Sequence, residues 1–377
     1  MTHEIQRIHR EAPFTDVHIH PSLKAYLFDR DLWKHRYSGR TFDPFASRSD
    51  FAMLEKGGYG AIWAAHYVPE RELFEDCLAA RLVASFLVPR FFEKISGNQF
   101  DRLIEMIDAM ERQVHRQPDR AEIAVNAADV KRIAAAGKIA VVHCIEGAHV
   151  LEDDPDNVEA NLEKLAGRGV AMITLCHFYN NGMAMQTDGI PPDNAVKKLC
   201  KLNFGSSEPL TELGRTVVRK MNELSMIVDV CHCSPEARQE IFAEVGTHRP
   251  IMASHVGVRE FMGDPYNPAD DEIEHIASTG GVVGVIFMTY WLDESHPKDG
   301  LEYIWKTVEH VHDVTGSWEH IAIGTDFDGF TDPPDDMRDA SQVGKLTRLM
   351  LDRGVTEADV KKVLGGNAQR LLELGWR

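Results

Sequence analysis

Histidine side chains stand at the ends of several short apolar runs of this chain. Residues 13–20 read Pro-Phe-Thr-Asp-Val-His-Ile-His, so a single residue separates His18 from His20. Alternate residues of a β-strand point to the same side, so both imidazoles can reach one point in space. Later apolar runs end in further metal-competent residues, among them Glu146, His232 and His255. Because imidazole is the commonest protein ligand of divalent transition metals, the set predicts a metal site.

The predicted donors, four imidazoles and one carboxylate, favour zinc, with iron, cobalt and manganese as alternatives. A catalytic zinc ordinarily takes three protein ligands and a water, so five donors exceed what one ion needs. Two divalent ions about 3.5–4 Å apart would use them all, with Glu146 shared through its two carboxylate oxygens. His143 lies on the same run as Glu146 and is either a competing ligand or a wall residue.

Asp326 ends a further apolar run, Ile321–Asp326, and is predicted to be a proton carrier. Zinc lowers the pKa of a bound water to about 7, so a neighbouring carboxylate can complete its deprotonation near neutral pH. The same carboxylate can then hand the proton to a leaving amine. Asp328 is expected to face the other way and to have a structural role.

Eight apolar runs recur along the chain, and most are four to eight residues long and rich in Val, Ile and Ala. They are Pro13–His18, Gly60–His66, Lys138–Cys144, Val170–Cys176, Met226–Cys231, Pro250–Ser254, Gly281–Phe287 and His320–Thr325. Nearly continuous runs indicate strands that are buried on both faces and therefore parallel. Helical patterns such as Thr211–Leu224 separate most of them. The alternation predicts an α/β protein with a closed (β/α)8 TIM barrel, which keeps catalytic residues at the C-terminal ends of its strands.

Two segments exceed what a minimal barrel needs, and they lie at about residues 21–57 and 67–137. The second contains long helical patterns at Glu70–Phe92 and Gln99–Gln117. We expect both segments to add helices after the first two strands, and the first to shape one wall of the site. No linker rich in Gly, Ser or Pro divides the chain, so residues 1–377 are expected to form a single catalytic domain.

The composition is that of an ordinary globular protein, with 44% hydrophobic and 27% charged residues among 377. The 41 Lys and Arg residues against 59 Asp and Glu residues give a net charge of −18, which argues against nucleic acid or an anionic membrane as the main partner. We see no secretory signal and no membrane-spanning stretch, so a cytoplasmic location is expected. A disulfide framework is not expected in such a chain.

The motifs taken together resemble the membrane (renal) dipeptidase family of zinc metallopeptidases, within the amidohydrolase superfamily. The resemblance runs from Asp16 to about Arg370. Its matching pieces are Asp16–His20, Glu146–Gly147, Ile173–His177, Pro209–Gly214, Met226–His232, Pro250–His255, Ile323–Gly329 and Gly365–Asn367. Each piece is modest, but their order and spacing are specific to the family.

The resemblance implies a division of roles among the candidate residues. It places His18 in the first metal site, makes Glu146 the bridge between two zinc ions, and gives His232 and His255 to the second. His177 is similar to the family histidine that contacts the substrate carbonyl or its tetrahedral oxyanion, and Asp326 is similar to the catalytic acid and base. The family is a dimeric barrel that cleaves dipeptides, and some members cleave β-lactams or acyl amino acids.

The chain departs from the family pattern at two positions. The family has His-x-Asp on its first strand, whereas this chain has His20 in place of the aspartate, and we keep His20 as a metal ligand. After His255, Tyr266 stands where the family has an arginine that grips the substrate carboxylate. Arg259 is the nearby replacement, and Asn180 is a further substrate-binding candidate. Because an Arg–carboxylate pair is strong and directional, Tyr is not its equivalent.

The working hypothesis is hydrolysis of the C–N bond of a small dipeptide or N-acyl amino acid by a hydroxide held between two metal ions. The same paired ions serve other reactions, so a lactone or phosphoester hydrolase is the first alternative. A non-catalytic binding protein on a barrel scaffold is the second. A peptide-like small molecule is the expected partner, and the resemblance implies a homodimer.

Overall fold

The structure is a computed structural model of the 377-residue chain. It describes residues 2–36, 46–75, 77, 81, 91–151, 155–179, 181–188 and 208–377.

The described strands form one sheet in which every pairing is parallel. They are β1 (Phe14–Ile19), β2 (Tyr59–His66), β3 (Ala121–Ala124), β4 (Ile139–Glu146), β5 (Val170–Thr174), β6 (Ile227–Asp229), β7 (Ile251–Val256), β8 (Val282–Val285) and β9 (Ile321–Ile323). The nine strands run in the order β2-β1-β9-β8-β7-β6-β5-β4-β3, and β2 also pairs with β4. That extra pairing closes the sheet and leaves β3 outside the ring. The predicted (β/α)8 barrel is therefore confirmed, with the eight predicted runs as its strands.

The strands are short and apolar because both of their faces are covered. All eight residues of β2 and all eight of β4 are buried, which explains why their sequences run almost without polar residues. The register of the β2–β4 pair is regular, from Ala61 opposite Ala140 to His66 opposite Ile145. β1 is less regular, since its register with β2 shifts between Asp16 and Ile19.

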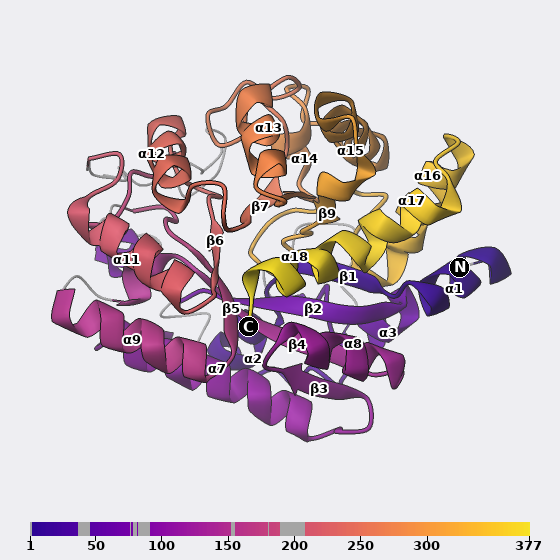
Figure 1. Cartoon of the computed structure of the whole chain (residues 1–377). Helices are drawn as coiled ribbons and strands as arrows, with labels where there is room; N and C mark the ends of the chain where they lie inside the picture. The colour runs from indigo at the N-terminus through magenta and orange to yellow at the C-terminus, as the bar shows by residue number, and fades with distance from the viewer. Residues whose placement is uncertain are drawn as a thin grey trace.

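Helices surround the barrel, and Figure 1 shows α9, α11, α12, α13 and α15 following one another around its outside. The described helices are α1 (His3–Glu11), α2 (Pro21–Leu27), α3 (Phe51–Gly57), α4 (Arg71–Glu75), α6 (Phe91–Ile95), α7 (Gln99–His115), α8 (Ala127–Ala135), α9 (Pro155–Gly167), α11 (Glu212–Glu223), α12 (Pro235–Val245), α13 (Asp270–Ser278), α14 (Thr289–Leu292), α15 (Leu301–Thr315), α16 (Gly344–Asp352), α17 (Glu357–Lys361) and α18 (Asn367–Gly375).

Several helices begin where the sequence supplies a capping side chain. Thr211 accepts a hydrogen bond from the Gly214 amide at the start of α11, and Ser234 does the same for Ala237 in α12. Such caps satisfy backbone N–H groups that have no partner inside the helix. In α12 the cap is followed by Pro235, whose fixed φ suits the first helical position.

The two long segments add more than helices. Residues 21–57 contribute α2 and α3, whereas 67–137 contributes α4, α6, α7, β3 and α8. The strand β3 was not expected, and it pairs with β4 through Ala121 opposite Ile139. The predicted helix at Glu70–Phe92 is present as α4, and most of its remainder lies outside the described residues.

The C-terminal segment continues as helix through its two glycines. A π-helical turn, Lys362–Gly366, joins α17 to α18 without a break. A Cβ atom on Gly365 would lie 2.7 Å from the Pro13 carbonyl oxygen, so only glycine lets the turn approach the start of β1. The Asn367 side chain then donates to the carbonyls of Trp318 and Ile321, at 2.7 and 2.8 Å. These contacts tie the last helix to β9.

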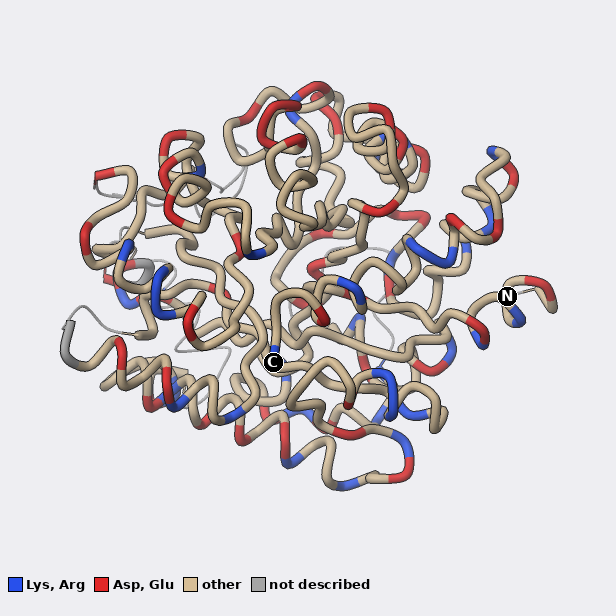
Figure 2. The backbone as a smooth tube through the Cα atoms, in the orientation of Figure 1, with Lys and Arg blue, Asp and Glu red and all other residues tan. Residues whose placement is uncertain are grey.

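Acidic and basic residues are mixed over most of the outer helices (Figure 2). The side formed by α13 and its neighbours carries more acidic than basic residues, and α13 itself has no Lys or Arg. No helix within the described ranges is long and apolar enough to cross a lipid bilayer. Among the described cysteines, Cys144, Cys176, Cys231 and Cys233 are free, whereas Cys77 takes part in a disulfide bond.

Candidate metal centre

The histidines that end the apolar runs converge on one point. His18 lies in β1 and His20 directly follows it, and their Nε2 atoms are 3.0 Å apart. His255 lies in β7 and His232 follows β6, and their Nε2 atoms are 3.1 Å apart. Both pairs come from the C-terminal ends of their strands. The i, i+2 spacing of the first pair therefore does bring both imidazoles to one place.

Glu146, the last residue of β4, lies between the two histidine pairs. Its Oε1 atom is 3.3 Å from His18 Nε2, 3.2 Å from His232 Nε2 and 3.3 Å from His255 Nε2. Its Oε2 atom is 3.5 Å from His20 Nε2. Gly147 follows with φ 89°, and a Cβ atom there would lie 2.4 Å from His149 Nδ1, so the turn after Glu146 requires glycine. A single carboxylate thus faces all four imidazoles.

These spacings fit metal ligation. Two nitrogens that are each about 2.0–2.1 Å from a tetrahedral zinc lie about 3.3 Å apart, close to the separations seen here. Three groups of three donors each have their ligand atoms within 4.8 Å of one another: His18, His20 and Asp326; His18, Asp229 and His255; Glu146, His232 and His255. The donor set could hold two divalent ions with Glu146 between them.

Burial favours the unprotonated state in two of the four imidazoles. It lowers the pKa of His18 to about 4, with the charge of His255 acting in the same direction. It also lowers the pKa of His232 to about 4, together with the charge of His177. Burial alone would raise the pKa of Glu146, but His177, His20 and His18 hold it well below its usual value. Neutral imidazoles and an ionised carboxylate are the forms that bind metal.

Asp326 follows β9 and faces the same cluster. Its Oδ1 atom is 3.1 Å from His20 Nε2, and its backbone N–H donates to the His18 carbonyl at 2.9 Å. Asp326 has φ 57° and His232 has φ 63°, which are left-handed values that cost energy for non-glycine residues. Such backbone strain gathers at functional sites. Asp328, in contrast, accepts from the amides of Arg48 and Ser49 away from the cluster.

Asp16 makes hydrogen bonds to the backbone of the first strand and does not contact the imidazole of a candidate metal ligand among the described residues. Its Oδ1 atom accepts the N–H groups of His18 and Thr325, at 3.2 and 3.0 Å, and its Oδ2 atom accepts the Thr325 hydroxyl at 2.6 Å. Complete burial raises the pKa of Asp16 to about 7. Because its hydrogen bonds join β1 to the loop after β9, Asp16 fixes the backbone on which His18 and Asp326 stand.

His177 follows β5 and lies beside the cluster, with its Nε2 atom 3.8 Å from Glu146 Oε2. Its other ring nitrogen, Nδ1, donates to Glu70 Oε1 at 2.9 Å, and the Phe178 amide donates to the same oxygen. Tyr67 donates its hydroxyl to the second oxygen of Glu70. Burial alone would lower the pKa of His177, but Glu70 and Glu146 raise it above its usual value.

Glu70 and Tyr67 were missed by the sequence analysis. Both lie just after β2, where residues Tyr67-Val68-Pro69-Glu70 follow the apolar run. The signal was available, because a glutamate just past the end of a barrel strand is costly to bury unless it is paired. Glu70 is buried, and His177 together with the Tyr67 hydroxyl holds its pKa far below the usual range despite the opposing effect of burial.

His143 is not part of the cluster. Its Nδ1 atom is 2.9 Å from His66 Nε2, and its Nε2 atom is 3.4 Å from Glu111 Oε1 on α7. Arg168 closes this polar group by donating to Glu111 at 2.6 Å. Of the two interpretations of His143, the competing ligand is therefore wrong, since its ring pairs with residues on the far side of β4 from Glu146.

The substrate-binding candidates have different surroundings. Tyr266 is buried, and its hydroxyl donates to the His255 carbonyl at 2.8 Å while its ring stacks on Trp291. The Arg259 guanidinium donates to the Asn267 carbonyl at 3.2 Å and to Glu272 at 3.3 Å. Asn180 lies outside the described residues. Neither Tyr266 nor Arg259 therefore directs a positive charge toward the metal cluster, by which we mean the side chains of His18, His20, Glu146, His232 and His255.

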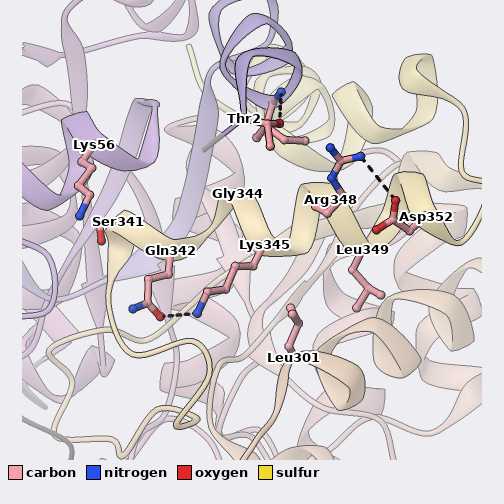
Figure 3. Close-up of a pocket in the computed structure, with 11 residues that line it drawn as sticks. Thr2, Lys56, Leu301, Ser341, Gln342, Gly344, Lys345, Arg348, Leu349 and Asp352 are labelled. Carbon is pink, nitrogen blue, oxygen red and sulfur yellow. Dashed lines mark hydrogen bonds and ion pairs between the residues drawn. The ribbon is translucent and has the colours of Figure 1, made fainter.

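A separate surface pocket of about 520 Å³ lies between α1, α15 and α16 and shares no residue with the cluster (Figure 3). Two pairs of its polar side chains contact one another: Lys345 donates to Gln342 at 3.2 Å, and Arg348 lies 3.5 Å from Asp352. None of the groups of three metal-competent residues among the described residues lies in this pocket.

The chain matches a known family over almost its whole length. The family model described as membrane dipeptidase, peptidase family M19, matches residues 2–374. The chain belongs to the membrane dipeptidase family. The resemblance inferred from the motifs is thereby confirmed, and with it the assignment to metallopeptidases of dipeptidase type.

Two relatives of the chain are named dipeptidases. The chain is 28% identical over 327 residues to the dipeptidase verJ of Clonostachys rogersoniana, covering 87% of this chain and 76% of the relative. It is 29% identical over 327 residues to the dipeptidase tcpJ of Claviceps purpurea, covering 87% of this chain and 69% of the relative.

Solved structures share the fold. A metallopeptidase of Rhodobacter sphaeroides, crystallised with a phosphinate mimic of the dipeptide L-Ala-D-Ala, is 22% identical, covers 97% of this chain and 99% of its own, and gives a TM-score of 0.77. The probable dipeptidase PvdM of Pseudomonas aeruginosa is 20% identical, covers 98% of this chain and 97% of its own, and also gives a TM-score of 0.77. At these identities the likeness shows the barrel fold.

Proposed function

We propose that this chain is a metal-dependent dipeptidase that hydrolyses the C–N bond of a small dipeptide or N-acyl amino acid. The observation that carries the proposal is the convergence of four imidazole Nε2 atoms on the two oxygens of Glu146, at 3.2–3.5 Å. The membership of the chain in the membrane dipeptidase family supports the choice of substrate class.

The donors divide naturally between two ions. His18 and His20 would hold the first ion, His232 and His255 the second, and Glu146 both. Paired divalent ions supply two things when bound, a water with a lowered pKa and polarisation of a carbonyl oxygen. Imidazole-rich sites of this kind suit zinc, so we propose two zinc ions.

Asp326 and His177 are the proposed catalytic residues. The Asp326 carboxylate is 3.1 Å from His20 Nε2, so it is placed to take a proton from the attacking water and to return it to the leaving amine. His177 donates its Nδ1–H to Glu70, and the Glu70 and Glu146 carboxylates raise its pKa above the usual value, so the protonated ring also carries an Nε2–H that can donate to the oxygen of the reacting carbonyl. The two residues approach the cluster from different strands, β9 and β5, so each can act on its own side of the substrate.

Substrate recognition is proposed to differ from the family pattern. By the resemblance, Tyr266 stands where the family has its carboxylate-binding arginine. The Tyr266 hydroxyl donates a hydrogen bond to the His255 carbonyl. Arg259 is engaged by Glu272 and Asn267. We therefore propose that the substrate carboxylate is not bound by an arginine of this loop, and Asn180 stays a prediction.

A panel of dipeptides, N-acyl amino acids, lactones and phosphoesters tests the function. Purified protein is assayed with the ions present and after removal of the ions by chelation, and its metal content is measured by elemental analysis. We expect about two zinc ions per chain and turnover of C–N substrates that chelation abolishes and added zinc restores. Turnover of only lactones or phosphoesters, or of nothing while two ions are bound, would contradict the proposal.

Compartment, assembly and domain organisation stay predictions. A homodimer and a single domain over residues 1–377 follow from the resemblance and from the absence of a linker. A cytoplasmic location follows only from the lack of a signal or membrane-spanning pattern in the sequence. Light scattering of the purified protein measures the assembly directly.

A further inference from the structure

One serine hydroxyl lies between the two halves of the metal cluster. Ser254 precedes His255 in β7, and its Oγ atom is 2.8 Å from His255 Nδ1. The same Oγ atom is 3.1 Å from His18 Nδ1. Ser254 therefore contacts one histidine from each pair, on the ring nitrogen opposite the one that faces Glu146. The residue is completely buried, so water does not compete for these contacts.

Asp229, the last residue of β6, sets the direction of these hydrogen bonds. Its Oδ1 atom accepts the amides of Cys231 and Ser254 at 3.2 and 2.9 Å, and its Oδ2 atom accepts the hydroxyls of Thr174 and Ser254, each at 2.6 Å. A carboxylate only accepts, and Ser254 has one hydroxyl proton, so that proton goes to Asp229. The sulfur of Cys231, at 3.6 Å from Ser254 Oγ, is a weaker and more distant acceptor.

A hydroxyl whose proton is engaged can still accept two hydrogen bonds. The Nδ1 atoms of His18 and His255 must then each carry a proton and donate it to Ser254. In the neutral rings the Nε2 atoms then carry the free lone pairs, and both lie 3.3 Å from Glu146 Oε1. This is the tautomer in which a neutral imidazole binds metal through Nε2.

We propose that Ser254, held by Asp229, is a shared positioning residue that fixes the metal-binding tautomer of His18 and of His255 at once. The inference rests on the proposed function, which gives His18 to one ion and His255 to the other. One buried hydroxyl thus prepares a ligand for each of the two ions. The remaining imidazoles lack this support, since Nδ1 of His20 and of His232 has no hydrogen-bond partner in the described part of the chain.

The test is a zinc titration of the metal-free protein, in which the two binding steps are followed by calorimetry against a competing chelator. Removal of a hydrogen-bond partner behind a ligand costs about 10–100-fold in metal affinity, so we expect Ser254→Ala to weaken both steps by this factor. Thr174→Val is the matched control, because it removes the other hydroxyl on Asp229 Oδ2 and touches neither ring. It is expected to cause a much smaller change.

Weakening of a single step by Ser254→Ala, or an equal effect of Thr174→Val, would overturn the proposal. If Ser254→Ala does not fold, ¹⁵N NMR of the ring nitrogens in the unchanged, zinc-loaded protein decides instead. We expect a protonated Nδ1 on both His18 and His255, and an unprotonated Nδ1 on either overturns the shared role. Both readouts are independent of turnover. Two tight binding steps without dipeptidase activity would therefore contradict the proposed function but leave the role of Ser254 intact.

Discussion

The candidate metal centre takes its residues from the ends of β1, β4, β6 and β7, and the loop after β7 contacts it through Tyr266, yet the polar groups of these two regions are arranged in opposite ways. In the cluster, the Nε2 atoms of His18 and His255 are turned toward a shared space by hydrogen bonds behind them. In the loop, Asn267 is completely buried and donates to the Trp291 carbonyl at 2.8 Å, while its own backbone carbonyl accepts from Arg259. The imidazole Nε2 atoms of the cluster therefore face one another, whereas the polar groups of the loop form hydrogen bonds within the loop and with its neighbours.

The two regions correspond to two proposed tasks: the cluster would carry out the hydrolysis, and the loop would recognise the substrate. The residues that we propose to hold ions and move protons lie together, and Asp326 and the Glu70–His177 pair are among them. We predict that Tyr266 stands where the family has its carboxylate-binding arginine, and the Tyr266 hydroxyl donates to the His255 carbonyl. A dipeptidase-type centre thus stands beside a loop that offers no free cation among its described residues. This pattern favours a change of substrate over a loss of catalysis.

Asp326→Asn gives the largest expected effect on the catalytic half of the comparison. The amide keeps the shape but cannot take a proton, so we expect kcat to fall by about 10²–10⁴-fold with two ions still bound. Steady-state kinetics and elemental analysis measure the two quantities. Asp328→Asn is the matched control and is expected to lower stability rather than kcat. A nearly normal rate, or loss of an ion from Asp326→Asn, would contradict the acid–base role.

Glu70→Ala should have the next largest effect. It removes the acceptor of His177 Nδ1, and a hydrogen bond to a charged group contributes about 1.5–3 kcal/mol, so kcat should fall by roughly 10–150-fold. Metal content should stay unchanged, and Glu70→Gln, which still accepts, should restore part of the rate. Glu111→Ala serves as the control because it contacts His143 instead. If both variants behave alike, Glu70 has no special role.

Metal uptake should release about one proton near neutral pH. Burial lowers the pKa of His255, but the Cys231 sulfur and the Glu146 carboxylate raise it well above its usual value. His255 must therefore lose a proton before it binds, whereas His18 and His232, with pKa values of about 4, are already neutral. Zinc affinity should rise with pH, about tenfold per unit for one proton. Calorimetry in buffers of different ionisation enthalpy counts the protons, and release of none would contradict this assignment.

Arg259→Ala should have the smallest effect. The guanidinium is already bound by Glu272 and the Asn267 carbonyl, so its removal should change KM by less than about threefold, in line with substitutions away from the site. Arg259→Lys is the comparison variant that keeps the charge. A tenfold rise in KM for substrates with a free carboxylate, absent for the corresponding amides, would show that the loop still recognises substrate.

The barrel strands and the metal donors could be predicted from the sequence. Strands buried on both faces read as continuous apolar runs, and each of the eight runs became a barrel strand. His18, His20, Glu146, His232 and His255 stood at the ends of such runs, so the parallel arrangement was enough to bring them together. The strand β3 was missed because its four residues, Ala-Glu-Ile-Ala, are too few to show a pattern against the helices on either side.

The contacts behind the site could not be predicted, because they depend on which side chains meet across strands. Ser254 meets His18 across 236 positions of sequence, and Glu70 meets His177 across 107. The interpretation of His143 as a ligand had the same weakness, since only the contact of its ring with Glu111 on α7 shows where the ring lies. Sequence periodicity assigns a residue to a strand end, but the direction of its ring and the proton it carries are set by neighbours from distant segments. The sequence by itself therefore determined which donors gather at the barrel mouth, and the tertiary structure decided how each is oriented and what remains free to bind substrate.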